Sequence, residues 1–182
     1  MNKLKFLTVA RVLYDKGFCE LVQAASILNR TYGNIEFQWL GAIDTGYAKF
    51  VAKDEVDQLH ERGILNYLGF QKDVREYMRA ADCIVLPSYH EGMSRVLMES
   101  LALRKPIITT NIPGCRELVD DGINGYLCEP RDVGSLVRAL EKFMKLSEEE
   151  RIRMGEMSRE KAEAQFDVKS VIAIYESIIT AI

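Results

Sequence analysis

The chain has 182 residues, of which 48% are hydrophobic and 28% are charged, and its formal net charge is −3. A chain of this size and composition can bury a full core, which excludes a disordered, collagen-like or disulfide-stapled protein. Nucleic-acid-binding proteins usually carry a basic excess, so the slight acidic excess counts against that class. We therefore expect residues 1–182 to form a single domain.

Short apolar runs alternate along the chain with segments of helical spacing. We predict strands at residues 4–10, 35–40, 64–68, 82–86, 106–109 and 124–128. We predict helices at residues 18–30, 54–62, 73–80 and 94–103, and from residue 132 almost to the end of the chain. In this last stretch we expect breaks near Gly155 and Asp167, and a helix start at Ser147 with Glu150 as its capping-box partner. The alternation predicts an α/β fold, with a parallel sheet flanked by helices on both faces and extra C-terminal helices.

Cysteine and histidine are sparse in this sequence. Cys83 and Cys128 lie in apolar runs and no C-x-x-C pair occurs, so we expect buried free thiols. The two histidines, His60 and His90, cannot form a His-rich metal site. No apolar run is long enough for a signal-peptide core or a membrane span. The sequence therefore predicts a reduced, cytoplasmic protein.

The loops at the carboxyl ends of the predicted strands form the candidate site, because ligands of open parallel sheets bind there. After the first strand, Arg11 and Lys16 stand just ahead of a predicted helix. Two cations beside a helix N-terminus favour a bound anion, because the exposed amides and the helix dipole add to their charge. The loop matches neither a Walker phosphate loop nor a G-x-G-x-x-G turn, so ordinary solvated surface charges are the alternative.

Two carboxylates, Glu91 and Glu99, follow the fourth predicted strand and are separated by seven residues. Glu91 is predicted in a loop, and Glu99 in the second turn of a helix that Ser94 would cap. The amides of residues 92–96 would then be free donors for a diphosphate, and Gly92 lets the backbone approach a ligand. The carboxylates could accept hydrogen bonds from sugar hydroxyl groups on either side of that anion. The spacing alone also fits two ordinary surface residues.

Four stretches of the sequence occur together in an order that is typical of one enzyme family. They are V-A-R-V-L-Y-D-K-G from residue 9, Y-L-G-F-Q-K-D-V-R-E-Y-M-R-A-A-D-C-I-V-L-P-S from residue 67, H-E-G-M-S-R-V-L-M-E-S-L-A from residue 90 and K-P-I-I-T-T-N-I-P-G-C-R-E-L-V-D-D-G-I-N-G-Y-L-C-E-P-R-D from residue 105. With them the chain resembles the C-terminal, nucleotide-sugar-binding domain of the retaining GT-B glycosyltransferases of family 4, also called group 1. The P-G-C-R-E form looks most like the members that build capsular and O-antigen polysaccharides. The resemblance implies a Rossmann-like sheet that forms one half of a GT-B fold.

The resemblance also implies roles for individual residues. Arg11 and Lys16 would hold the donor diphosphate and stabilise the charge on it as it leaves. Glu91 would meet hydroxyl groups of the transferred sugar, and we expect these three residues to be catalytic. The other donor-binding residues that the resemblance implies are Gly92, Met93 and Ser94 through their amides to sugar and phosphate, Glu99 to the ribose, and Gly69, Phe70 and Gln71 to the base.

The implied activity is retaining transfer of a hexosyl or N-acetylhexosaminyl group from a nucleotide-diphosphate sugar, which we expect to be UDP-linked, to a polysaccharide or lipid-linked acceptor. We expect no metal or other cofactor, because Arg11 and Lys16 would neutralise the leaving group. A GT-B nucleotide-sugar 2-epimerase and a non-catalytic nucleotide-binding module are the alternatives. We expect no nucleic-acid partner.

The resemblance places the acceptor in an N-terminal domain that this chain lacks. We therefore expect the native chain to begin before Met1, and the isolated domain to bind donor weakly and to transfer nothing. The full-length enzyme would be cytoplasmic or peripheral at the inner membrane face, with membrane contact only through the missing domain or the acceptor. One departure stands out, because many relatives have glycine where this chain has Arg104. We expect altered helix-cap geometry there and little effect on the site.

Overall fold

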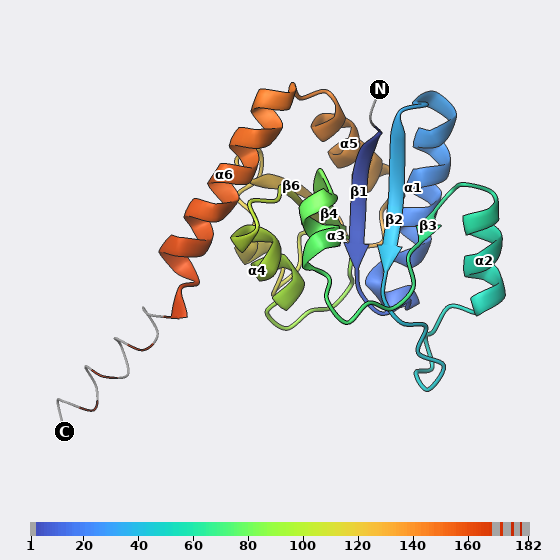
Figure 1. Ribbon diagram of the computed structural model, residues 1–182, viewed down its shortest axis with the longest axis horizontal. Coiled ribbons are helices and arrows are strands. Elements are labelled where there is room, and N and C mark those ends of the chain that lie inside the picture. Colours follow the sequence, from blue (N-terminus) through green and yellow to red (C-terminus); the bar gives the residue numbers. More distant parts are fainter. Residues whose placement is uncertain (1–2, 169–171, 173–175, 177–178, 180–182) are drawn as a thin grey trace.

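The computed structural model of the chain describes residues 3–168, 172, 176 and 179. A six-stranded sheet in the order β3-β2-β1-β4-β5-β6 organises the molecule, and every neighbouring pair of strands is parallel (Figure 1). The strands are β1 (Leu4–Val9), β2 (Ile35–Leu40), β3 (Asn66–Tyr67), β4 (Cys83–Leu86), β5 (Ile107–Thr110) and β6 (Gly125–Cys128). This doubly wound, Rossmann-like arrangement confirms the predicted α/β class.

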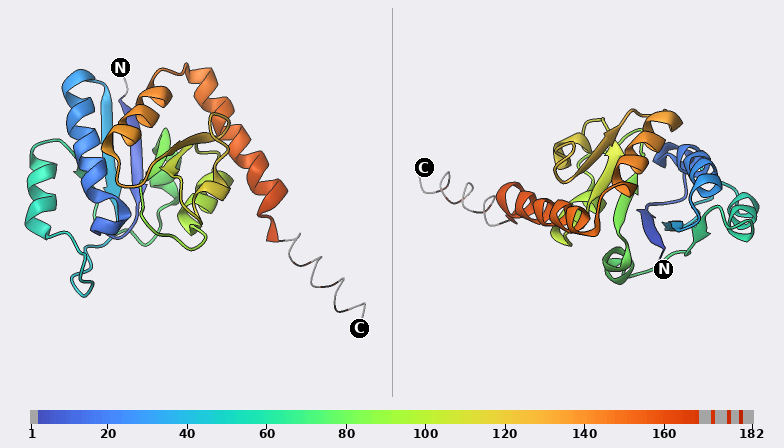
Figure 2. Two further views of the ribbon diagram at one scale, coloured as in Figure 1. Left: turned by 180° about the vertical axis from the view of Figure 1, so that it is seen from behind. Right: turned by 90° about the horizontal axis from the view of Figure 1, so that it is seen from above.

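Helices cover both faces of the sheet (Figure 2). They are α1 (Phe18–Thr31), α2 (Lys53–Glu61), α3 (Arg75–Ala80), α4 (Arg95–Ala102), α5 (Val133–Met144) and α6 (Glu148–Gln165), with 3-10 turns η1 (Tyr14–Lys16) and η2 (Arg116–Leu118). The predicted elements are therefore all present, with ends that differ by one to two residues at most positions. The strand predicted at 64–68 is shorter, because only Asn66 and Tyr67 pair with β2.

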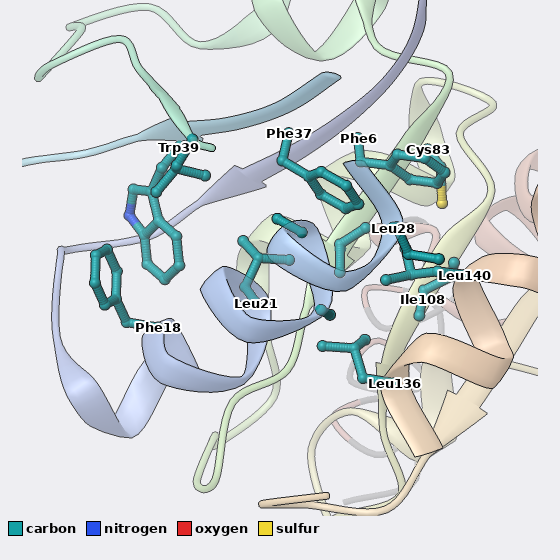
Figure 3. Close-up of a cluster of buried hydrophobic side chains, with 14 of the residues drawn as sticks. Phe6, Phe18, Leu21, Leu28, Phe37, Trp39, Cys83, Ile108, Leu136 and Leu140 are labelled. Atoms are coloured by element: carbon teal, nitrogen blue, oxygen red, sulfur yellow. The ribbon is translucent and has the colours of Figure 1, made fainter. Parts of the chain in front are cut away.

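Two apolar clusters separate at the sheet, because successive side chains of a strand point to opposite faces. Phe6 packs on the α1 and α5 face, where its ring stacks on that of Phe37 with centroids 5.1 Å apart (Figure 3). The next residue, Leu7, packs on the α3 and α4 face with Met78 and Leu97. Burial on both faces fixes the register of β1, and this register carries the loop after Val9 to the carboxyl edge of the sheet.

The C-terminal helices differ from the prediction in one respect. The break expected near Gly155 is wrong, because α6 runs through that position. A Cβ at Gly155 would lie 2.3 Å from the carbonyl oxygen of Arg104, so the glycine serves a close helix contact. The chain breaks instead ahead of Ser147, which caps α6 in a capping box with Glu150 as predicted. The break expected near Asp167 is confirmed, since α6 ends at Gln165. The predicted helix beyond it falls partly on residues 169–171, 173–175, 177–178 and 180–182, which lie outside the described residues.

Arg104 occupies the position after the cap of α4 with a φ of 58°, in the left-handed region. The amide of Lys105 donates to the Ser100 carbonyl, and the amide of Arg104 donates to the Leu101 carbonyl. This pair of hydrogen bonds is a Schellman ending, which glycine favours. The expected change in cap geometry is therefore absent, and Arg104 adopts the conformation that glycine would have.

The four cysteines are free thiols, and Cys83, Cys115 and Cys128 are buried. Burial raises the pKa of Cys115 to about 11 and that of Cys128 to about 12. Both thiols are therefore neutral at physiological pH and pack as small apolar groups. Among the described residues, no helix is long and apolar enough to cross a membrane.

Candidate functional site

The sheet has its switch point between β1 and β4. From β1 the chain winds outward through β2 and β3, and it then returns to place β4 on the other side of β1. The loops after these two strands leave the carboxyl edge in opposite directions, and the crevice between such loops is where ligands of doubly wound folds bind. Both loops carry residues that the sequence predicts for the site.

The loop after β1 carries Lys16 to this switch point. It closes in the turn η1 and passes through Gly17, whose φ is 76°. A Cβ at Gly17 would lie 2.1 Å from the carbonyl oxygen of Pro87 at the end of β4. The absence of a side chain therefore lets the two loops touch, which carries Lys16 against the segment that contains Glu91.

Lys16 and Glu91 form a direct ion pair. The Lys16 ammonium donates to Glu91 Oε1 at 2.7 Å, and the two side chains are only 20% and 16% exposed. The sequence predicts both residues at one site but does not predict this contact. An ammonium and a carboxylate side by side can bind one ligand that carries a phosphate next to hydroxyl groups.

The loop that carries Glu91 is held mainly by its own backbone. The Ser88 carbonyl accepts a hydrogen bond from Thr110 Oγ1 at 2.5 Å, and the Ser94 amide donates to the Gly114 carbonyl at 3.0 Å. Gly114 lies directly against Gly92, since a Cβ there would be 1.4 Å from the Gly92 carbonyl oxygen. The loop is thus fixed from β5 and from the P-G turn that the sequence shows at 113–114.

A cluster of Glu20, Tyr89 and Arg131 supports the same loop from its other side. The Tyr89 hydroxyl donates to the Glu20 carboxylate of α1 at 2.6 Å, and the Arg131 guanidinium lies over the Tyr89 ring, 4.7 Å from its centroid. Burial, followed by the hydrogen bond to Glu20, raises the pKa of Tyr89. The neutral hydroxyl therefore remains a donor at physiological pH. The sequence analysis missed this cluster, since its members are far apart in the chain and follow no common motif.

Arg11 also lies at the carboxyl edge but does not contact a predicted site residue. Its Nη1 donates to Asp44 Oδ2 at 2.9 Å, and its guanidinium lies 5.1 Å from the centroid of the Tyr47 ring. Both partners belong to the segment between β2 and α2, which projects from this edge in Figure 1. The sequence analysis missed Asp44 and Tyr47, although the loop after residue 40 was among the candidate loops.

Glu99 follows the Glu91 loop along the chain and lies in helix α4. It is exposed on α4 and borders a hollow of about 760 Å³ between α4 and the start of α3, which Lys72, Asp73 and Val74 also line. This position agrees with the predicted second turn of the helix. The predicted contact of Glu99 with the ribose stays a prediction.

The loop after β3 carries the three residues that are predicted to meet the base. Gly69 has a φ of 70°, and its carbonyl accepts a hydrogen bond from the Gly41 amide at 2.9 Å. The ring of Phe70 is 70% exposed, whereas Gln71 is partly buried. An exposed aromatic ring offers a stacking face for a planar base, and the predicted contact with the base stays a prediction.

The start of α4 corrects one detail of the prediction. Ser94 is the N-cap residue, but its side chain makes no capping hydrogen bond. Its amide already donates to Gly114, so it is not among the free amides expected at residues 92–96. Met93 is half-exposed. The predicted contacts of these residues with sugar and phosphate stay predictions.

A second hollow, of about 840 Å³, lies at the opposite, amino edge of the sheet. Its lining has an excess of cations, which include Lys105 and Arg151, and these two donate to backbone carbonyl groups. In the part of the chain that the structure describes, no group of three or more His, Cys, Asp or Glu side chains could hold a metal ion. The carboxyl edge therefore remains the candidate site, because it gathers the predicted residues.

Comparison with known sequences identifies a protein family that matches most of the chain. The family model described as "Glycosyl transferases group 1" matches residues 1–161. The N-acetyl-alpha-D-glucosaminyl L-malate synthase of Bacillus anthracis is 33% identical over 125 residues, 68% of this chain and 32% of that protein. The capsular polysaccharide biosynthesis glycosyltransferase CapM of Staphylococcus aureus is 27% identical over 172 residues, 93% of this chain and 44% of CapM. The chain thus spans about a third to a half of the length of these relatives.

Solved structures show the same fold. The Anabaena protein Alr3699/HepE, crystallised in complex with UDP, superposes with a TM-score of 0.86 at 22% identity, over 100% of this chain and 50% of that chain. The C-terminal domain of the glycosyl transferase group 1 family protein LpcC from Francisella tularensis superposes with a TM-score of 0.77 at 21% identity, over 92% of this chain and 89% of that chain.

Proposed function

Because this chain belongs to the glycosyl transferases group 1 family, we propose that it is the donor-binding domain of a retaining family 4 glycosyltransferase. It would bind a nucleoside-diphosphate sugar for transfer to a polysaccharide or lipid-linked acceptor. The complex of HepE with UDP supports UDP as the nucleotide. The likeness to CapM supports a role in polysaccharide assembly, including capsule-type polymers.

The observation that carries this proposal is the contact between Lys16 and Glu91 at 2.7 Å. In a nucleoside-diphosphate sugar, the hydroxyl groups of the sugar lie within a few bonds of the β-phosphate. A carboxylate that accepts from the hydroxyl groups must therefore stand beside a cation that meets the phosphate. The ion pair at the carboxyl edge has this arrangement, and its low exposure strengthens both interactions.

Catalysis would then rest on electrostatic stabilisation of the leaving group. Cleavage of the anomeric bond places negative charge on the leaving diphosphate, and a cation that is already in position stabilises that charge without reorganisation. Lys16 would do so together with Arg11, which lies earlier in the same loop after β1. We propose that these cations suffice without a metal ion. Glu91 would orient the sugar, Glu99 the ribose and Phe70 the base.

The acceptor, the transferred hexosyl or N-acetylhexosaminyl group and the cellular location belong to the whole enzyme. We propose that the acceptor binds an N-terminal domain outside this chain, and that transfer needs both domains. A cytoplasmic enzyme, peripheral at the inner membrane face, would suit a lipid-linked acceptor. The C-terminal domain of LpcC, which was crystallised alone, supports study of such a domain in isolation.

Calorimetric titration of the chain with UDP, GDP and a panel of UDP-sugars tests the donor assignment. We expect saturable binding of UDP and of at least one UDP-sugar, with the same Kd in the presence of EDTA. If none of these ligands binds, the proposed function is wrong. Incubating the full-length enzyme with donor alone distinguishes the epimerase alternative, which would yield an epimerised sugar without an acceptor.

A further inference from the structure

The side chain of Arg11 is held from two sides by one segment. Its Nη1 donates to Asp44 at 2.9 Å, and Tyr47 lies against the face of its guanidinium. The Arg11 and Asp44 side chains are 51% and 38% exposed. This pair is therefore much more accessible to a ligand than the pair of Lys16 and Glu91.

Asp44 is itself held in place. Its second oxygen, Oδ1, accepts a hydrogen bond from the Gly46 amide at 3.2 Å, which fixes the carboxylate in a turn. The segment is joined to the loop after β1 by backbone hydrogen bonds from Val12 to Ala42 at 2.9 Å and from Val51 to Val12 at 3.2 Å. The carboxylate thus faces Arg11 as a fixed feature of the fold, unlike a freely rotating surface side chain.

The two ion pairs at the edge differ in what a donor could offer them. Glu91 can exchange its hydrogen bond from Lys16 for hydrogen bonds from sugar hydroxyl groups. Its carboxylate therefore still has partners when the donor is bound. Asp44 borders the residue that would meet the diphosphate, and a carboxylate there repels phosphate oxygens. Exposed ion pairs contribute little stability and exchange readily, so the diphosphate and Asp44 would bind the same guanidinium in competition.

We propose that Asp44 competes with the diphosphate for Arg11 and so weakens retention of the nucleoside-diphosphate product, an inference that rests on the proposed function. When the product leaves, Arg11 pairs with Asp44 again, so both charges regain a partner within the protein. Asp44 is in this view a positioning residue, because it acts through Arg11 and needs no contact with the donor.

The test is the affinity of the chain for UDP in the Asp44→Asn variant. Asparagine keeps the oxygen that accepts from Gly46 and removes the charge. We expect the Kd for UDP to fall by about threefold to tenfold at low ionic strength, as expected for removing one like charge near a diphosphate. The gain should shrink toward none in about 1 M salt, where exposed charges are screened. Glu156→Gln, an exposed position on α6, is the charge-matched control and should leave Kd unchanged.

The outcomes separate the two proposals. An unaltered chain that binds no UDP overturns the proposed function and this inference with it. A chain that binds UDP with the same or lower affinity after Asp44→Asn overturns the inference alone. A gain that Glu156→Gln reproduces, or that persists undiminished at high salt, also overturns it, because it would not arise from a local charge beside Arg11.

Discussion

Cations lie at both edges of the sheet, but they have different hydrogen-bond partners at each edge. At the amino edge, the Lys105 ammonium donates to the carbonyl groups of Arg79 and Ala81 at the end of α3, at 2.6 and 2.7 Å. At the carboxyl edge, Lys16 and Arg11 meet carboxylates that belong to other loops. Backbone carbonyls at a helix end need a permanent donor, whereas a carboxylate partner can be exchanged for a phosphate. The chemistry of the partner, more than the number of cations, therefore distinguishes a ligand site from a structural one.

The largest effect should come from the carboxyl edge. Replacing Lys16 or Glu91 with alanine in the full-length enzyme should lower the transfer rate at least about tenfold, because under the proposed function each change removes a group that would act on the reacting sugar diphosphate. Initial rates with saturating acceptor would measure it, and Glu156→Gln is the control. Unaltered rates in both alanine variants would contradict the assignment.

A smaller effect of a different kind should come from the amino edge. Lys105→Met keeps the apolar stem but removes the ammonium from the two carbonyl groups that it bonds. We expect the free energy of unfolding to fall by about 1–2 kcal/mol, measured by urea denaturation, and the Kd for UDP to stay unchanged. Loss of UDP affinity in this variant would break the comparison, since it would give the amino edge a role in ligand binding.

The smallest effect should be a gain. Arg104→Gly removes a side chain from a left-handed position without disturbing the Schellman hydrogen bonds, so we expect stability to rise by about 1 kcal/mol. Lys145→Gly is the matched control at the cap of α5, where φ is −78° and glycine gives no such relief. That variant should be slightly destabilised. A loss of stability in Arg104→Gly would show that the arginine side chain supports the amino edge.

The sequence was sufficient for the fold wherever periodicity was strong. Runs such as Cys83–Leu86, which is buried at every position, are typical of central strands, and their order along the chain implied the helical crossovers. The prediction of a helix break at Gly155 was wrong, because a glycine needed for close packing looks the same in sequence as a glycine that ends a helix. Only the position of Arg104 on a neighbouring helix end distinguishes the two.

The sequence predicted which side chains lie at the carboxyl edge but not which contacts they make there. Motif and loop position placed Lys16 and Glu91 together, and the structure brings them to 2.7 Å. The contact of Arg11 with Asp44 joins residues 33 positions apart through a loop without periodicity, so no local pattern announces it. Contacts of this kind depend on where irregular segments fold back, which tertiary packing decides.

The way the Glu91 loop is anchored has a consequence for diversity of function. Its attachments run through the backbone of Ser88, Gly92 and Ser94 and through the side chain of Tyr89, while the side chains of His90 and Met93 are exposed. These two positions can therefore vary without loosening the loop. A library randomised at both should yield a large fraction of folded variants, and differences among them would appear as changes in sugar preference. Under the proposed function, selection in nature or in the laboratory would then change the bound sugar through these two side chains while the anchored backbone stays the same.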